Sequence, residues 1–297
     1  MTGLVIAGVD GSAPSLTAVT CAAREAELRD AALRLVHAFA WPAPRTPMDG
    51  MVSRPMRAHL LDLADRLVEE ASDRARAAAP GVEVSGTIKR GDPLTVLESE
   101  SRTADLVVVG SRGLGGFAKL LVGSTSMGLA AHARCPVLVV REPADAAGPV
   151  LLGVDGSPAG AEAVRFAFDE ASRRRARLLA LHAWTTWNAP LPPPLSPALP
   201  YSNEPGALAA AEERLLAETI AGLCERYADV RVERRAVNGP TREALIEASR
   251  TAQLTVAGSR GRGGFTGLLL GSVSQALLQH ARGPVAVVRG RDPGRRG

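Results

Sequence analysis

A glycine-rich segment occurs twice in this chain, and its residue types and spacing suit the binding of phosphate. The first copy, GSRGLGGFAKLLVGSTS, occupies residues 110–126 and the second, GSRGRGGFTGLLLGSVS, occupies residues 258–274, with twelve of seventeen positions identical. Phosphate binding needs several backbone N–H groups aimed at one point, and glycine permits both the close approach and the unusual dihedral angles. Each copy is therefore a candidate phosphate-binding loop.

Both copies keep the same spacing, which is a glycine, a second glycine after two residues, and a Gly-Ser pair after nine more. The Gly-Ser pair opens a stretch that is expected to be helical, and the first N–H groups and partial positive end of a helix attract anions. Hydroxyl groups there could add hydrogen-bond donors or a ligand for Mg²⁺. The candidate phosphate-binding residues are Gly110, Ser111, Arg112, Gly113, Gly115, Gly116, Gly123, Ser124, Thr125 and Ser126 in the first copy, and Gly258, Ser259, Arg260, Gly261, Gly263, Gly264, Gly271, Ser272, Val273 and Ser274 in the second.

Two common phosphate-binding motifs do not match these loops. A Walker loop would end in Gly-Lys-Ser/Thr, and a dinucleotide-binding fingerprint would follow the first strand of a domain rather than the fourth. A glycine-rich segment is also often only a turn, and this structural interpretation is the alternative. The duplication favours binding, because the two halves have diverged around the loops while the glycine spacing is the same in both.

Apolar runs alternate with helical stretches along both halves of the chain. A helix is expected from Pro14 to about Arg29, with Ser12 as its N-cap. Strands joined through helices form parallel sheets by right-handed crossovers. The pattern predicts an α/β fold of two tandem Rossmann-like open parallel five-stranded sheets with helices on both faces. The expected strands cover residues 4–9, 33–38, 82–88, 106–109 and 137–140, then 150–154, 178–181, 230–237, 254–257 and 285–288.

The repeat also predicts the domain boundaries. Asp-Gly-Ser recurs 145 residues apart, at Asp10 and Asp155, and the glycine loops recur 148 residues apart, so each half holds one complete unit. We expect a first domain at 1–143, a linker at 144–149, a second domain at 150–290 and a basic disordered tail at 291–297. Proline-rich loops are expected at 41–55 and 184–205.

Asp10 and Gly110 each follow the end of an expected strand. Ligands of open α/β sheets bind beyond the carboxyl ends of the strands, where the strand order reverses, so the two segments should meet at one crevice. Asp10 and its counterpart Asp155 could accept hydrogen bonds from a ribose or adenine group. Their alternative role is to cap the turn or helix that follows.

Composition narrows the classes of partner and compartment. The last nine of the 297 residues carry +3 of the net charge of +4, so the body of the protein is nearly neutral and a nucleic-acid partner is not expected. The three cysteines have no CxxC spacing, which predicts neither a disulfide framework nor a thiolate metal site. The first residues resemble neither a signal peptide nor a membrane span, so we expect a cytoplasmic protein without a membrane partner.

Several further motifs accompany both glycine loops, and they are VDGS at 9–12 and 154–157, His-Ala at 37–38 and 182–183, ADLVVVGSRG at 104–113, and CPVLVVR at 135–141. With these motifs the chain resembles the universal stress protein family in its tandem-domain form, with the loop of the ATP-binding subtype. It implies an ATP-binding protein that commonly forms a homodimer. By position, it implies that the adenine and ribose end is lined by Gly8, Asp10 and Ala38, and in the second half by Gly153, Asp155 and Ala183.

The second half departs from the first at two places near the loops. Gln253 replaces Asp105, and Gly-Pro-Thr at 239–241 replaces Gly-Asp-Pro at 91–93. Neither place is expected to contact phosphate. Both sites are therefore expected to bind nucleotide, although their affinities need not be equal.

Three functions agree with these observations. The favoured one is a nucleotide-dependent stress or regulatory protein read by an unidentified protein partner, because two intact loops occur without a recurrent general base. The second is a slow ATPase or phosphotransferase, which would need a positioned water. The third is a nucleotide-free interaction scaffold. The histidines that recur in register are expected to be structural, and they are His37 with His182 and His132 with His280.

Overall fold

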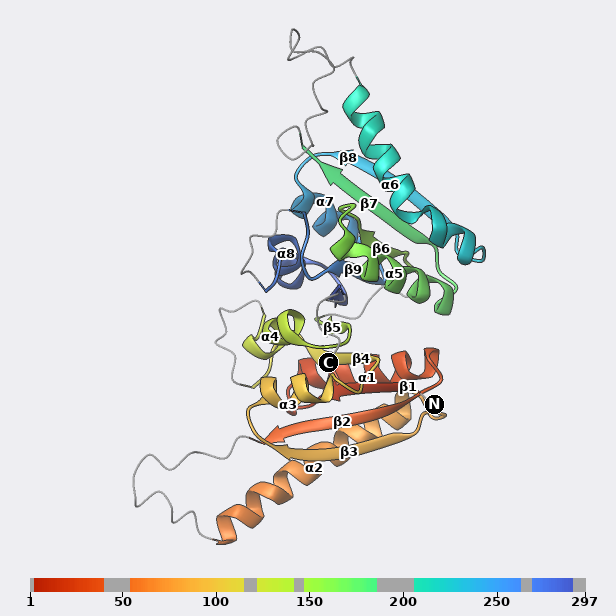
Figure 1. Cartoon of the computed structure of the whole chain (residues 1–297). Helices are drawn as coiled ribbons and strands as arrows, with labels where there is room; N and C mark the ends of the chain where they lie inside the picture. Colours follow the sequence, from red (N-terminus) through yellow and green to blue (C-terminus); the bar gives the residue numbers. More distant parts are fainter. Residues whose placement is uncertain are drawn as a thin grey trace. The chain divides into compact units, whose positions relative to one another are not determined.

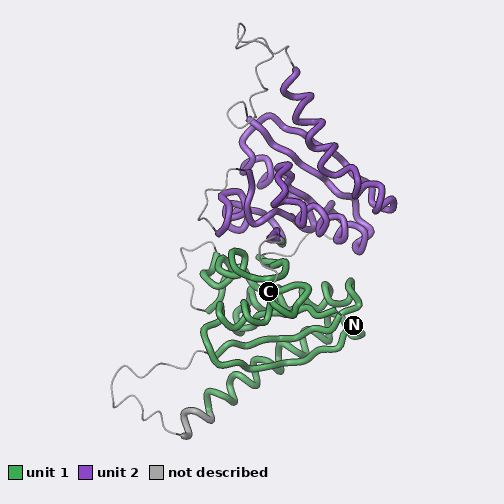
Figure 2. The backbone as a smooth tube through the Cα atoms, viewed as in Figure 1, with its two compact units in different colours: residues 1–143, 284–287 green, residues 144–283, 288–297 purple. Residues whose placement is uncertain are grey.

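The structure of the chain is a computed structural model that describes residues 3–39, 54–114, 122–141, 147–185, 206–262 and 269–290, with the backbone alone at 54–58. The chain divides into two compact units (Figure 2), of which unit 1 is Met1–Pro143 with Pro284–Val287 and unit 2 is Ala144–Gly283 with Val288–Gly297. The expected linker lies only partly within the described residues. The expected tail, most of the two proline-rich loops, and Gly115, Gly116, Gly263 and Gly264 lie outside them.

Unit 1 is a parallel sheet with two layers of helices (Figure 1). Its elements are β1 (Gly3–Gly8), α1 (Ala13–Leu28), β2 (Ala31–Phe39), α2 (Arg54–Ala78), β3 (Val84–Arg90), α3 (Pro93–Glu100), β4 (Leu106–Gly110), α4 (Ser124–His132) and β5 (Val137–Val140). The strand order is β3-β2-β1-β4-β5, with parallel pairing throughout. Helix α1 packs against α2, and α3 packs against α4, which gives one layer on each face.

The central strands β1 and β4 form the core of unit 1. Val5, Ile6, Val107 and Val108 are fully buried, as expected for continuous apolar strands covered on both faces. Helix α1 faces these strands with small side chains such as Ala22, which is also fully buried. Small residues let the helix lie close to the sheet. The start of α1 therefore comes close to the end of β4.

Side-chain caps determine where two helices of unit 1 begin. The Ser12 hydroxyl accepts the N–H of Ser15 at 3.3 Å, and the Asp92 carboxylate accepts the N–H of Thr95 at 3.1 Å. A proline follows in the first turn of each helix, where its missing N–H costs nothing. The expected Ser12 cap is thus confirmed, and it keeps the connection between β1 and α1 short.

Unit 2 repeats this order of elements. They are β6 (Val150–Gly153), the 3₁₀ turn η2 (Pro158–Gly160), α5 (Ala161–Arg173), β7 (Leu178–Trp184), α6 (Ala207–Arg226), β8 (Val232–Asn238), α7 (Thr241–Ala248), the 3₁₀ turn η3 (Ser249–Thr251), β9 (Leu254–Gly258), α8 (Ser272–His280) and β10 (Val285–Val288). The strands β9, β6, β7 and β8 pair in parallel in that order. The expected strands are therefore found, with ends that differ by a few residues.

The strand pairing differs in one respect from two separate five-stranded sheets. Pro284–Val287 belong to unit 1, where β10 pairs antiparallel with β5 in the register Val285↔Val139 and Val287↔Val137. The sheet of unit 1 therefore continues beyond β5, in the order β3-β2-β1-β4-β5-β10. The expected α/β class with a mainly parallel sheet is found, but a split into two sheets is not. Without β10, the outer edge of β5 would present unpaired backbone groups, and this short apolar strand pairs with them.

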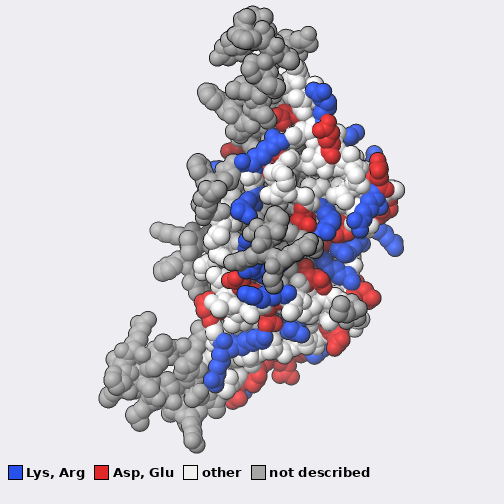
Figure 3. Space-filling view, in the orientation of Figure 1, with Lys and Arg blue, Asp and Glu red and all other residues white. Residues whose placement is uncertain are grey.

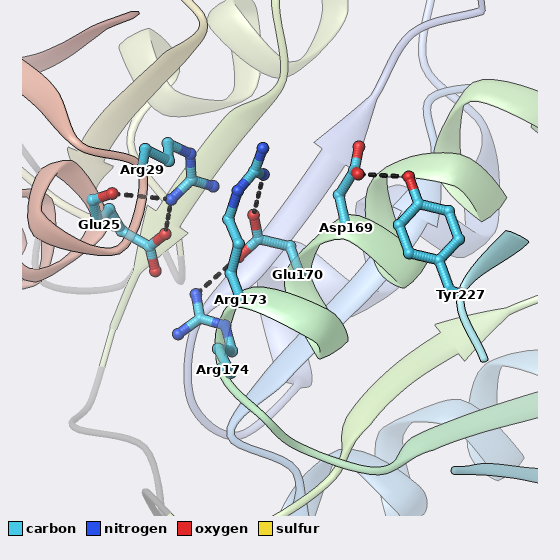
Figure 4. Close-up of polar contacts among 7 residues, drawn as sticks. All are labelled: Glu25, Arg29, Asp169, Glu170, Arg173, Arg174 and Tyr227. Carbon is cyan, nitrogen blue, oxygen red and sulfur yellow. Dashed lines mark hydrogen bonds and ion pairs between the residues drawn. The ribbon is translucent and has the colours of Figure 1, made fainter. Parts of the chain in front are cut away.

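A buried glutamate–arginine pair lies in the last turns of the first long helix of each unit (Figure 4). Glu25 pairs with Arg29 at the end of α1, and Glu170 pairs with Arg174 at 2.8 Å at the end of α5. Both glutamates are buried. Arg173 also lies 3.7 Å from Glu170, so two arginines at the end of α5 pair with one buried carboxylate.

Lys and Arg side chains mix with Asp and Glu side chains over the described surface seen in Figure 3. No helix within the described residues has both the length and the apolar composition that a membrane crossing requires.

Candidate functional site

The carboxyl ends of two adjacent central strands bring the predicted site residues together in unit 1. Strands β1 and β4 are neighbours in the register Ala7↔Val108. From β1 the chain passes through α1 to β2, which is the neighbour of β1 in one direction of the strand order. From β4 it passes through α4 to β5, which is the neighbour of β4 in the opposite direction. The strand order reverses here, which is the usual position of a ligand crevice in this type of fold. Asp10 and Gly110 lie at this point.

Asp10 joins the turn after β1 to the glycine loop after β4. Its Oδ1 accepts hydrogen bonds from the Ser12 N–H at 3.0 Å and the Ser12 hydroxyl at 2.6 Å, and its Oδ2 accepts the Leu114 N–H at 2.9 Å. The residues joined in this way are 104 positions apart in the chain. The carboxylate therefore holds the first part of the glycine loop beside the start of α1.

The same contacts keep Asp10 ionised. Burial alone would raise the pKa of the Asp10 carboxyl. The hydrogen bonds from the Ser12 hydroxyl and from the Ser12 and Leu114 N–H groups outweigh this effect, so the pKa lies below its ordinary value of 3.8. Of the two roles considered for Asp10, the structure shows the capping one. A contact with ribose or adenine stays a prediction.

Unit 2 repeats this connection. Strands β6 and β9 are neighbours in the register Leu152↔Val256. Asp155 Oδ1 accepts the Ser157 N–H at 2.9 Å and the Ser157 hydroxyl at 2.8 Å, and Oδ2 accepts the Arg262 N–H at 2.9 Å. We call this arrangement, in which Asp10 or Asp155 joins its turn to its glycine loop, the aspartate tie.

Several loop glycines are required by close packing. A Cβ on Gly110 would lie 2.8 Å from the carbonyl carbon and oxygen of Pro14 at the start of α1, and one on Gly113 would collide with Asp10 Oδ2. In unit 2, a Cβ on Gly261 would lie 2.8 Å from Asp155 Oδ2. These glycines are explained by the aspartate tie and by helix packing, with no ligand.

The glycine at the start of the next helix has no such explanation. A Cβ on Gly123 would come no closer than 3.6 Å to its neighbours, and one on Gly271 no closer than 3.4 Å, which are ordinary contacts. Their backbone angles are also ordinary, with φ and ψ of −71° and 152° for Gly123 and of −71° and 154° for Gly271. Among the described residues, no side chain caps the N–H groups of α4 or α8. Neither close packing nor backbone conformation within the described residues therefore requires glycine at these two helix starts.

The predicted hydroxyl donors fall into two groups. Ser126 donates to the Gly110 carbonyl at 2.7 Å and Ser274 donates to the Gly258 carbonyl at 2.6 Å, and both side chains are buried. They therefore fasten the helix to the strand end. Ser124 and Ser272 are exposed at the first position of α4 and α8. The remaining predicted residues at these helix starts are the half-buried Thr125 and Val273.

Ser111 and Ser259 continue the strands into the loops. Their N–H groups donate to the carbonyls of Val140 and Val288, each at 2.8 Å, and both residues are buried. Arg112 and Arg260 follow them and are exposed, and neither forms an ion pair with another described residue. Arg112 and Arg260 are thus each an available cation next to an aspartate tie.

The residues predicted for the adenine end lie on the strands beside the tie. Gly8 and Gly153 lie under α3 and α7, because a Cβ would lie 2.9 Å from Leu97 Cδ1 or 3.1 Å from Leu245 Cδ1. Ala38 and Ala183 lie near the ends of β2 and β7, next to β1 and β6 respectively. These glycines are explained by packing, and the contact of the two alanines with adenine stays a prediction.

The histidine before each of these alanines donates to the backbone next to the tie. His37 Nδ1 lies 2.8 Å from the Val9 carbonyl oxygen, and His182 Nδ1 lies 2.7 Å from that of Val154. In unit 2, His182 Nε2 also contacts Glu212 Oε2 at 2.7 Å, and both residues are buried. Sequence reasoning missed Glu212. The signal that could have identified it is its spacing, because Glu212 precedes Leu216 and Ile220 at intervals of four residues and so shares the buried face of α6 with them.

The remaining nucleophiles and possible metal ligands do not add a second site. Burial raises the pKa of the Cys135 thiol to about 12, which keeps it protonated and unreactive. Among the described residues, no three His, Cys, Asp or Glu side chains are grouped so that they could hold a metal ion.

Comparison with known proteins places this geometry in a family. The model of the universal stress protein family matches residues 1–141 and again residues 147–289. The chain belongs to the universal stress protein family. Its two family domains carry one aspartate tie each.

Relatives in the universal stress protein family extend over the full tandem. The chain is 42% identical to a universal stress protein of Mycolicibacterium smegmatis, with 97% of each covered, and 40% identical to one of Mycobacterium tuberculosis, with 96% of each covered. A solved universal stress protein from Archaeoglobus fulgidus has the same fold, with a TM-score of 0.70 at 19% identity and 97% of each chain covered.

Proposed function

We propose that each unit binds one adenine nucleotide, with ATP as the ligand, in the crevice beside its aspartate tie. The observation that carries this proposal is the pair Gly123 and Gly271. Each begins a helix without a side-chain cap, and neither is glycine because of a close contact or an unusual backbone angle. A bound anion would accept hydrogen bonds from the N–H groups that no described side chain caps.

The phosphates would then contact groups at the start of α4 and α8. In unit 1 these are the N–H groups of Ser124 and Thr125, the Ser124 hydroxyl and the Arg112 side chain. In unit 2 they are the corresponding groups of Ser272, Val273 and Arg260. The exposed serine hydroxyl is also the group that could contact a Mg²⁺ ion carried by the nucleotide. Ala38 and Ala183 would face the adenosine end.

The aspartate tie supports this proposal because it holds the first part of each loop, residues 110–114 and 258–262, without a ligand. A loop that is already held next to the helix start loses less conformational entropy when a nucleotide binds. Both Asp10 oxygens already accept hydrogen bonds from the chain, so we assign Asp10 a positioning role rather than that of a catalytic base. The protein is accordingly proposed to sense nucleotide and not to turn it over rapidly.

The downstream part of the proposal is a homodimer and a regulatory protein partner that reads the nucleotide-bound form. It follows from the family resemblance and from two binding crevices in one chain. Light scattering with and without ATP tests the dimer. A mass that stays at one chain, 30.9 kDa, under both conditions would exclude it.

The decisive experiment replaces Gly123 and Gly271 with serine, alone and together. Ser12 caps α1 with φ and ψ of −70° and 153°, almost the angles of Gly123, so Gly123→Ser should cap α4 in the same way. The new hydroxyl would occupy the N–H groups that the phosphates need. We expect ATP affinity to fall by at least about tenfold in the altered unit, while thermal stability stays equal or rises, because a serine cap is worth at least as much as glycine.

Gly81→Ser is the matched control, because a Cβ on Gly81 meets no atom within 4 Å and the residue lies in the turn before β3. Isothermal titration calorimetry measures affinity, and thermal melts with ATP at a hundredfold above its dissociation constant should show about 2.7 kcal/mol of stabilisation in the parent chain. Equal ATP affinity in the parent and in the double serine variant would refute the proposed site.

A further inference from the structure

The two aspartate ties differ in one side chain. Leu114 in unit 1 and Arg262 in unit 2 lie 148 positions apart, which is the offset of the two glycine loops. Each donates its N–H to the tie aspartate at 2.9 Å, so the backbone is held in the same way in both units. The side chains are opposite in character, because Leu114 is apolar and 75% exposed while Arg262 is a cation.

Arg262 reaches over the turn that follows β6. A Cβ on Gly156 would lie 2.6 Å from Arg262 Nη2, which places the guanidinium at the Asp155–Ser157 turn. The counterpart, Gly11, has only Leu67 as a neighbour at this distance. The guanidinium therefore lies beside the aspartate tie of unit 2, whereas the corresponding turn of unit 1 has only the apolar Leu67 at this distance.

This guanidinium is available to a ligand. Arg262 is exposed and forms no ion pair or side-chain hydrogen bond with another residue in the described ranges. Its backbone is fixed by Asp155, so less conformational freedom is lost when it contacts a ligand. A guanidinium also matches phosphate by two parallel hydrogen bonds.

We propose that Arg262 makes unit 2 select its ligand by the number of phosphates. Unit 2 should prefer a nucleoside triphosphate to the monophosphate by a larger factor than unit 1 does, and its affinity should depend more on salt. The inference rests on the proposed nucleotide binding and names the residue that would set the specificity of one of its two sites. Lys119 of the first loop lies outside the described residues, so the test exchanges the side chains at this one position.

The experiment uses the full chain with one crevice blocked at a time. Gly123→Ser leaves unit 2 to be measured, and Gly271→Ser leaves unit 1. ATP and AMP are titrated by calorimetry at low and high salt into each background, with and without Arg262→Leu or Leu114→Arg. Arg234→Leu, on the exposed edge strand β8, is the control that removes the same charge elsewhere.

In unit 2, Arg262→Leu should lower ATP affinity by about fivefold at low salt and AMP affinity by less than about twofold, because an exposed charge pair contributes up to about 1 kcal/mol. Leu114→Arg should raise the ATP-to-AMP affinity ratio of unit 1 by a similar factor. Arg234→Leu should leave both ratios unchanged. If either blocking variant fails to fold, the same two substitutions are measured in the unblocked chain as changes in the two-site ATP and AMP isotherms.

The outcomes separate the two proposals. Saturable ATP binding with the same ATP-to-AMP ratio in the Arg262→Leu variant would overturn the role of Arg262 and leave nucleotide binding intact. No saturable binding of either nucleotide in the parent chain would overturn both.

Discussion

The two units hold their glycine loops by the same backbone contacts but support them with different side chains. Each has an aspartate tie, and each has a buried serine that bonds the helix start to the strand end. In unit 2, a buried His182–Glu212 pair lies under the tie. In unit 1, Ala64 stands 148 positions before Glu212, so His37 has no such partner within the described residues.

Unit 1 has a buried charge of its own at another place. Glu100, at the end of α3, is buried and pairs with Lys89 on β3 and with Arg34 at 3.5 Å on β2. The corresponding residue of unit 2, 148 positions on, is Ala248. The comparison shows that both units share the contacts that hold the glycine loop to the main chain, whereas their buried ion pairs lie at different positions.

The largest change in the stability of one unit relative to the other should come from Glu212→Ala. This substitution gives unit 2 the alanine that unit 1 has at the corresponding position, Ala64. The change leaves a buried histidine nitrogen without its partner, which costs about 2–3 kcal/mol. Residue-resolved hydrogen exchange should show this loss in the opening free energy of unit 2 and no change in unit 1.

Glu213→Ala, at an exposed position on the same helix, is the control and should leave both units unchanged. A loss in Glu212→Ala smaller than about 0.5 kcal/mol, the usual range of surface substitutions, would show that the bond to Val154 alone holds His182.

A smaller effect, with a defined pH dependence, is expected for Asp10→Asn. The hydrogen bonds that the charged Asp10 carboxylate accepts should contribute about 1–1.5 kcal/mol to the free energy of unfolding at neutral pH. This contribution is already reduced for the partial exposure of Asp10. The pKa of Asp10 is lowered in the folded chain. The stabilisation is therefore complete above the unfolded value of about 4 and is lost as the pH falls through the folded value.

Thermal melts of the parent chain and Asp10→Asn from pH 7 down to pH 2 measure this difference. Asp73→Asn, which removes an exposed carboxylate of α2, is the control. A constant difference between the parent and Asp10→Asn over the whole range would contradict an ionised Asp10 in the tie.

The smallest expected difference in stability is between the serine-to-alanine substitutions at the two helix starts that follow β1 and β6. Ser12 caps α1, whereas Ser157 precedes the 3₁₀ turn η2 and caps no N–H group. Ser12→Ala should therefore destabilise unit 1 by about 0.5–1 kcal/mol, and Ser157→Ala should cost unit 2 less. Hydrogen exchange at the first turns of α1 and α5 provides the measurement. Equal losses would mean that the hydroxyl bond to the aspartate, present in both units, is the main contribution.

Most of the fold could be predicted from local patterns. The apolar runs marked the strands, Ser12 and Pro14 marked the start of α1, and the 148-residue offset marked the repeat. The pairing of β5 with β10 could not be predicted, because both are four-residue apolar strands and nothing in either sequence specifies an antiparallel partner.

The candidate site was only partly predictable. The positions of Asp10 and Gly110, each after the end of an expected strand, correctly indicated that the two segments meet. The repeated spacing did not separate Gly113, which is required by contact with Asp10, from Gly123, which is not required by any contact. That distinction depends on atoms from segments about one hundred residues apart, which no local pattern records.

The sequence by itself determined the repeat, the α/β class, the family resemblance and the two loops, because periodicity, caps and turn residues act within a few positions along the chain. Only the tertiary structure decided that Asp10 and Asp155 tie their loops, that Glu212 meets His182, and that Arg262 lies over Gly156. These contacts form where parallel strands end side by side, and the distance between such ends is set by the packing of the whole unit.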